Sequence, residues 1–167
     1  MQNYFLGIAL PKTLEAEIEK WRRKFRAPRT APHITLIPPF TWAHDYERLL
    51  QIVKDVEKRH GPFLIRGEGL GNFGRRVLFV NVELSPELRS FQQDLAEILA
   101  EHGIPREKRP YHPHITLATR LRSNDFNKYQ RQLEGYSPSY EFIFRETAVF
   151  KLFSEGSIKR WKMLRGI

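Results

Sequence analysis

A five-residue motif occurs twice in this chain, and it constrains the possible folds more than any other feature. Residues 32–36 read Pro-His-Ile-Thr-Leu, and residues 113–117 repeat this motif without a change. In an extended strand, residues two apart lie on the same face of a sheet. Each copy therefore sets a histidine and a threonine on one face, with an isoleucine and a leucine on the other. The motif predicts two strands, each with one apolar face for a core and one polar face.

The predicted secondary structure repeats in the same order as the motif. Strands are expected at about 4–10, 32–37, 63–73, 77–84, 112–118, 139–153 and 158–165. Helices are expected from a cap at Thr13, over 45–59, from Ser85-Pro86 to about Gly103, and over 124–134 after Ser123. We expect Pro38-Pro39 to end the first motif strand, because proline lacks the N–H that a central strand donates. Each half then runs strand, helix, motif strand, helix, strand.

This repetition predicts one domain made of two similar lobes. The chain has 167 residues, a length typical of a single domain, and no flexible linker divides it. The predicted fold is of the α+β class over residues 1–167. Lobe 1 is expected at about 1–74 and lobe 2 at about 75–153, with a closing strand at 158–165 that belongs to either lobe. Each lobe is expected to hold a mostly antiparallel sheet with helices outside, and the motif strands are expected to face a central cleft.

Composition narrows the classes of function. Cysteine is absent, which excludes disulfides, thiolate catalysis and cysteine zinc sites. Lysine and arginine number 28 against 19 aspartates and glutamates, and the resulting net charge of +9 suits a polyanion such as nucleic acid. A cationic surface without such a partner is the alternative. The N-terminal segment lacks the pattern of a signal peptide, and no apolar run approaches the ~20 residues that span a bilayer. The sequence therefore predicts a cytoplasmic protein that does not enter membranes.

The two motifs together offer the groups that acid–base chemistry on a phosphate needs. If their strands face each other, His33 and His114 meet Thr35 and Thr116 in one cleft. An imidazole has an ordinary pKa of about 6.5, so one ring can act as a base while another acts as an acid. Threonine hydroxyls donate to phosphate oxygens on which negative charge develops. A lone strand histidine is more often structural, but repetition of the whole motif favours a catalytic pair.

Two His-x-Thr motifs about 80 residues apart in a small two-lobed chain resemble the two-histidine phosphoesterase superfamily. Its members include the RNA 2′,3′-cyclic phosphodiesterases, also called 2′-5′ RNA ligases. The resemblance extends over nearly the whole chain through the strand–helix order, and its specific part is the two motifs at 32–36 and 113–117. After the first motif, residues 37–42 read Ile-Pro-Pro-Phe-Thr-Trp, where the common pattern has a Phe-Leu-Gly-like segment.

The resemblance implies an activity and a role for each motif residue. Water would open a 2′,3′-cyclic phosphate at an RNA or nucleotide end to a 2′-phosphate, and 2′-5′ RNA ligase activity is a further option. His33 would protonate the departing 3′-oxygen, and His114 would activate the water. Thr35 and Thr116 would bind the phosphate. No metal and no cofactor are implied, and the expected protein is a monomer whose partners are RNA ends or nucleotide cyclic phosphates.

Weaker candidates flank the motifs. Tyr111, Phe40 and Trp42 are placed to stack a base, although packing in the core or at its rim is an equal alternative. Arg120 lies six residues after His114 and is a candidate to hold a phosphate, or else a solvated strand-end arginine. His112 either shares the polar face with the second motif or only enters the strand.

Three other functions stay open from the sequence. His33, His112 and His114 could supply three imidazoles to a zinc ion. The paired lobes could bind a nucleotide or an RNA end without turning it over. The substrate could also be a different phosphodiester, such as a 2′-5′ linkage, a cyclic oligonucleotide or an ADP-ribose cyclic phosphate.

Overall fold

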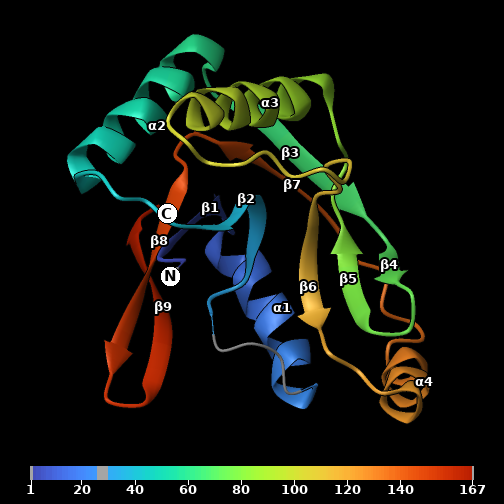
Figure 1. Cartoon of the computed structure of the whole chain (residues 1–167). Coiled ribbons are helices and arrows are strands. Elements are labelled where there is room, and N and C mark those ends of the chain that lie inside the picture. The colour runs from blue at the N-terminus through green and yellow to red at the C-terminus, as the bar shows by residue number, and fades with distance from the viewer. Residues whose placement is uncertain (1, 26–29, 167) are drawn as a thin grey trace.

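The computed structural model describes residues 2–25 and 30–166. Within these residues the helices are α1 Lys12–Lys24, α2 Tyr46–His60, α3 Pro86–Glu101 and α4 Ser123–Gln132 (Figure 1). The strands are β1 Tyr4–Ala9, β2 His33–Phe40, β3 Phe63–Glu68, β4 Leu70–Phe73, β5 Val77–Asn81, β6 His114–Ala118, β7 Ser139–Phe144, β8 Ala148–Glu155 and β9 Ile158–Arg165. None of the described helices is both long and apolar enough to span a bilayer.

A seven-stranded sheet places the two motif strands side by side at its centre. Its order is β4-β5-β6-β2-β1-β8-β9, and β3 pairs with β7 in a separate two-stranded sheet. Every pairing in both sheets is antiparallel. The predicted α+β class with mostly antiparallel sheets is therefore confirmed.

The two motif strands meet at the middle of their motifs. In the described residues, β2 and β6 share one ladder pair, in which Ile34 lies opposite Ile115. Because the strands are antiparallel, the two identical motifs run in opposite directions from this pair, as a pseudo-twofold axis through it requires. The large sheet thus consists of two wings, β4-β5-β6 and β2-β1-β8-β9, that join at this narrow seam.

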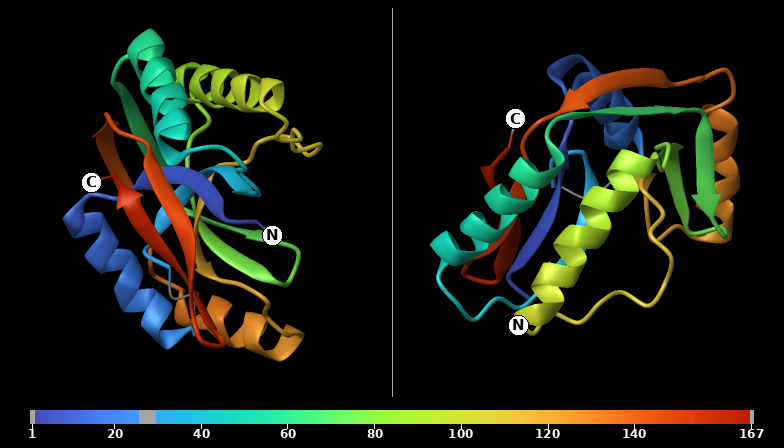
Figure 2. Two further views of the ribbon diagram at one scale, coloured as in Figure 1. Left: turned by 60° about the vertical axis from the view of Figure 1, so that its left-hand side comes forward. Right: turned by 90° about the horizontal axis from the view of Figure 1, so that it is seen from above.

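The apolar residues of both motifs point into one core. Ile34, Leu36, Ile115 and Leu117 are at most 1% exposed. The same core cluster takes in side chains from all four helices, and α2 packs against α3 (Figure 2). The histidine and threonine of each motif are less buried than these neighbours and lie on the opposite face, as the alternation predicts.

The helix starts are partly as expected. Ser85 caps α3, since its Oγ accepts a hydrogen bond from the Leu88 N–H at 3.1 Å. The predicted cap at Thr13 is wrong, because α1 begins one residue earlier. The extended backbone of Pro11 precedes this helix and no side chain caps it. Ser123 is the first residue of α4 rather than the residue before it.

The predicted end of the first motif strand is also wrong, because β2 continues through both prolines to Phe40. The ladder with β1 changes register here: Leu6 lies opposite Ile37, whereas Tyr4 lies opposite Phe40. From one pair to the next, β2 advances by three residues while β1 advances by two. The prolines lie where the regular hydrogen-bond ladder is interrupted, so their missing N–H groups cost little.

The expected strand at 139–153 is two strands in different sheets. β7 pairs with β3, and β8 pairs with β1. Between them, the Thr147 N–H donates to the Glu57 carboxylate at 2.6 Å, which anchors the corner to α2. Strand pairing thus joins segments that are distant in the sequence, while the lobe limits at 74 and 75 stay a prediction.

Candidate active site

The structure brings His33, Thr35, His114 and Thr116 together on one face of the sheet. The pair Ile34–Ile115 sets the register, which places His33 across from Thr116 and Thr35 across from His114. Directly opposed residues in an antiparallel pair have Cβ atoms roughly 5 Å apart, and diagonal ones roughly 7–8 Å apart. The two imidazoles occupy a diagonal of this register, and, in addition to burial, the charge of His114 lowers the pKa of His33, so the two rings interact electrostatically.

Both histidines make the same local hydrogen bond. The Nδ1 of His33 lies 2.8 Å from the Ala31 carbonyl oxygen, and the Nδ1 of His114 lies 2.8 Å from the His112 carbonyl oxygen. A carbonyl oxygen accepts only, so we assign the ring proton to Nδ1 in both neutral imidazoles. Each Nε2 then carries the lone pair for proton transfer. The hydrogen bond at Nδ1 also fixes the orientation of each ring.

The His33 ring is packed between aromatic side chains. Its centroid lies 4.9 Å from that of Phe5 on β1 and 5.2 Å from that of Phe150 on β8. Gly7 allows β1 and β2 to approach closely beside this ring, because a Cβ there would lie 2.6 Å from the Ile34 carbonyl oxygen. Burial lowers the pKa of His33 to about 4, against the opposing effect of its backbone hydrogen bond.

The His114 ring stands in a more open aromatic setting. Phe73 and Phe79 lie 4.9 and 5.1 Å from it between ring centroids, and Phe73 is 36% exposed. The exposed ring of His112 contacts the same two phenylalanines at 5.0 and 5.5 Å, so it shares the side of His114. Burial lowers the pKa of His114 as well, while its hydrogen bond to the His112 carbonyl raises it.

Comparison with known proteins shows the family of this chain. The family model of the 2′-5′ RNA ligase superfamily matches residues 10–152, which include both motifs. The chain belongs to the 2′-5′ RNA ligase superfamily. The resemblance read from the two motifs is thus confirmed, and with it the enzyme class, since this is a family of phosphoesterases.

Individual members of the superfamily are similar over most of the chain. An RNA 2′,3′-cyclic phosphodiesterase of Bacillus subtilis is 25% identical over 86% of this chain and 94% of its own length. A protein of the same name from Geobacillus stearothermophilus is 30% identical over 70% of this chain and 41% of its own length. A crystal structure from Thermus thermophilus has a TM-score of 0.69 at 22% identity, and E. coli LigT complexed with 3′-AMP has 0.66 at 22%. Both structures are matched over 98% of this chain and 95% of theirs, which shows a shared fold.

Tyr111 connects the two superfamily motifs. It precedes His114 by three residues, and its hydroxyl donates a 2.7 Å hydrogen bond to the backbone carbonyl of Thr35. Its ring packs against the core cluster, and burial raises its pKa. Tyr111 therefore packs within the protein and does not present its ring to stack a base.

Two other aromatic candidates are corrected by the structure. Phe40 and Trp42 are 5% and 4% exposed and belong to the core, so their rings are not available to stack a base. The Trp42 indole N–H also has a partner within the protein, because it donates to the Asp45 carbonyl at 3.0 Å. Arg120 is exposed on a left-handed backbone turn (φ 55°) beyond the end of β6, and its phosphate contact stays a prediction.

The phenylalanines around the histidines were not recognised from the sequence. The sequence does indicate the face on which Phe79 lies. It stands between the predicted core residues Leu78 and Val80, so its side chain must point to the opposite face of the strand. No sequence pattern indicates that Phe5 and Phe150 lie beside His33, because this position depends on the pairing of β1 with β8. The contact of Phe73 with His114 likewise depends on the hairpin of β4 and β5.

The zinc alternative has no support in the structure. Within residues 2–25 and 30–166, no group of three His, Cys, Asp or Glu side chains is gathered closely enough to hold a metal ion. The His112 and His114 ring centroids are 6.3 Å apart, and His33 stands on the neighbouring strand.

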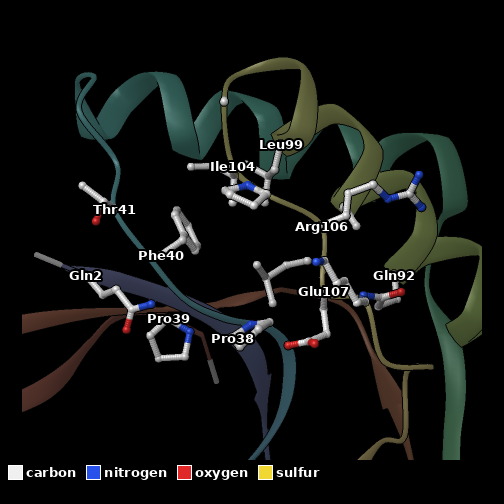
Figure 3. A pocket seen from close by; sticks show the side chains of 15 residues that line it. Gln2, Pro38, Pro39, Phe40, Thr41, Gln92, Leu99, Ile104, Arg106 and Glu107 are labelled. Carbon is white, nitrogen blue, oxygen red and sulfur yellow. The ribbon is translucent and has the colours of Figure 1, made fainter.

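Two cavities lie outside the motif residues. One, of about 510 Å³, lies between the Phe40 end of β2 and the segment after α3, where Figure 3 shows Pro38 and Pro39 across from Arg106 and Glu107. The other, of about 620 Å³, is lined by Asn81 and Tyr140, among others. Asn81 lies opposite His114 in the ladder, so the second cavity begins beside the second motif.

Proposed function

We propose that this protein is a phosphodiesterase that opens 2′,3′-cyclic phosphates at RNA or nucleotide ends to 2′-phosphates. The observation that carries the proposal is the pair of imidazoles on one sheet face, each with Nδ1 bound to a backbone carbonyl and each beside a threonine. The two relatives named RNA 2′,3′-cyclic phosphodiesterase support the substrate class. The net charge of +9 favours a polyanionic substrate.

The reaction needs one base and one acid. A water oxygen forms a bond to phosphorus while one imidazole Nε2 accepts a proton from that water. The bond from phosphorus to the 3′-oxygen breaks, and the second imidazole, protonated at Nε2, gives its proton to that oxygen. The hydroxyls of Thr35 and Thr116 donate hydrogen bonds to the non-bridging oxygens, where negative charge increases in the transition state.

The division of roles is open to experiment. The family resemblance implies that His33 is the acid and His114 the base. Burial acts against this assignment, because it lowers the pKa of His33 to about 4 and so keeps that ring neutral. Burial lowers the pKa of both rings, whereas a phosphate anion bound beside the acid would favour its protonated form.

A phosphodiester with an aryl leaving group distinguishes the two roles. Such a group departs without a proton, so the acid is dispensable while the base is not. The variant that lacks the acid, His33→Ala or His114→Ala, is expected to regain most of the wild-type rate on the aryl ester. If both variants stay equally slow on it, the division into one acid and one base is wrong.

The proposal as a whole is tested with a nucleoside 2′,3′-cyclic phosphate. We expect turnover in the presence of a chelator, and a 2′-phosphate as the product. Binding without turnover between pH 5 and 8 would instead support a binding module. A 3′-phosphate product would contradict the assigned direction of ring opening.

The same site supports ligation by the same step with another nucleophile. If the 5′-hydroxyl of a second RNA takes the place of water, its oxygen bonds to phosphorus and gives its proton to the base. The bond to the 3′-oxygen breaks, that oxygen takes the proton of the acid, and the two ends are joined through a 2′-5′ bond, with which the family name agrees. We propose hydrolysis as the main activity, carried out by a monomer in the cytoplasm. Other nucleotide phosphodiesters would require the same four motif residues and a different binding surface.

A further inference from the structure

The hairpin of β8 and β9 is a cationic edge of the large sheet (Figure 1). Its basic residues are Lys151, Lys159, Arg160, Lys162 and Arg165, against the single acidic residue Glu155. Arg165 is neutralised by Glu57 and Glu146, and Lys162 lies 3.5 Å from Glu155. Lys159 and Arg160 are exposed and form no ion pair within the part of the chain that the structure describes.

An aromatic row connects this hairpin with the first motif. Trp161 makes an edge contact with Phe5 at 4.9 Å between centroids, and Phe5 contacts His33 at the same distance. The register sets Trp161 opposite Leu152 and Lys159 opposite Ser154. Trp161 and Lys159 therefore lie on the sheet face that carries His33, with Lys159 farther from the motif along the strand.

The side of the second motif carries two arginines on the turn between β4 and β5. Arg75 donates to the Ser123 carbonyl and to the Asn127 side chain at 3.5 and 2.7 Å. Arg76 is exposed, and Phe73 offers exposed aromatic area beside it. Single-stranded nucleic acid binds where cations follow the backbone and a ring stacks a base, and the β8–β9 hairpin combines both.

We propose that the β8–β9 hairpin binds the single-stranded RNA that leads up to the cyclic phosphate, with Trp161 stacking a base and Lys159 contacting a phosphate on the face that carries His33. Arg160 points to the other face of β9 and adds positive charge at this edge strand. This role of the hairpin rests on the proposed function and makes it more specific: the substrate is an RNA end rather than a free nucleotide. A nucleotide occupies the motif residues alone, whereas an oligonucleotide also reaches the hairpin.

The test compares two substrates that differ only in length. One is a nucleoside 2′,3′-cyclic phosphate, and the other is a short oligoribonucleotide that ends in the same group. The double variant Lys159→Glu/Arg160→Glu is expected to lower kcat/KM for the oligonucleotide by about tenfold or more and to change it for the nucleotide by less than about twofold. The salt dependence for the oligonucleotide also becomes shallower, by about 0.7 in the log–log slope for each phosphate that the hairpin no longer neutralises.

A matched control separates local contacts from net charge. Lys54→Glu/Lys58→Glu changes the charge by the same amount at exposed positions of α2, and it is expected to leave the ratio of the two kcat/KM values unchanged. An equal change of that ratio in both double variants overturns the proposal, because net charge would then explain it. Equal losses on both substrates in the hairpin variant also overturn it.

A binding measurement keeps the proposal testable if the proposed function fails. Should the wild-type protein hydrolyse neither substrate, fluorescence anisotropy with an oligoribonucleotide that ends in a plain 3′-hydroxyl still measures binding to the hairpin. Weaker binding in the hairpin variant than in the α2 variant supports the RNA surface without the activity. Equal affinities of these two variants show that the hairpin does not bind RNA.

Discussion

The two copies of the motif are identical in sequence and differ in surroundings. Both histidines bind the carbonyl two residues upstream at 2.8 Å. The first ring is enclosed by Phe5 and Phe150, while the second lies beside an exposed Phe73. The comparison teaches that the motif itself sets ring orientation and tautomer, whereas the neighbouring strands set the pKa.

The segments that lead into the two motifs are also held differently. Before the first motif, the buried Arg22 donates to the Thr30 carbonyl at 2.7 Å and pairs with Glu19. Before the second motif, Tyr111 reaches across to the Thr35 carbonyl. Helix α1 thus holds the segment before the first motif, whereas the segment before the second motif is held by the first motif.

The largest expected effect comes from removing either imidazole. His33→Ala and His114→Ala should each lower kcat/KM for a nucleoside 2′,3′-cyclic phosphate by about 10²–10⁴-fold, the range of a lost general acid or base. Steady-state rates measure this, and circular dichroism checks that each variant is folded. Near-wild-type turnover in one of them would remove that histidine from the proposed mechanism and end the functional symmetry of the motifs.

The threonines should show a smaller loss. Thr35→Ala and Thr116→Ala each remove one hydrogen bond to a charged phosphate, which corresponds to about 1.5–3 kcal/mol of transition-state stabilisation. Comparing kcat/KM of the two variants shows whether the hydroxyls contribute equally. Thr→Ser at the same positions is the control and should restore most of the rate, because it keeps the hydroxyl.

Tyr111→Phe tests the contact between the motifs. The substitution keeps the packed ring and leaves the Thr35 carbonyl without this donor, which should lower the free energy of unfolding by about 1–3 kcal/mol. We also expect a lower kcat, because the seam between β2 and β6 has one ladder pair in the described residues. Denaturant unfolding and kcat at saturating substrate measure both. Tyr136→Phe is the comparison. The Tyr136 hydroxyl donates a 2.6 Å hydrogen bond to the Glu17 carboxylate, and neither residue belongs to a motif. An equal fall of kcat in both variants would contradict a role for the seam.

The smallest expected effect is a pH dependence of stability that differs between the motifs. The pKa of His33 falls from 6.5 to about 4 on folding, so the unfolded chain binds more protons between these values. This contribution to stability is present above pH 6.5 and is lost as the pH falls toward 4. Urea unfolding at several pH values gives the free energy of unfolding as a function of pH. We expect this free energy to rise less steeply with pH in His33→Ala than in His114→Ala. The reverse order would show that His33 is the less perturbed ring.

Much of the local structure could be predicted. The alternation inside the motif predicted both faces of β2 and β6, helical spacing predicted four helices near their observed positions, and the Ser85 cap is present. These features depend on neighbours in the sequence. The errors at Thr13 and Pro38 concern single residues whose backbone depends on where a strand or helix meets its partner.

The sequence by itself determined that two identical polar faces exist and that imidazole and hydroxyl groups occupy them, because strand periodicity and side-chain chemistry are local properties. Tertiary structure alone decided that the motifs meet at Ile34 and Ile115, that residues 139–155 divide between two sheets, and that Phe40 and Trp42 are buried. It also decided the unequal burial of His33 and His114. Each of these depends on contacts between segments far apart in the chain, whose pairing no local pattern specifies.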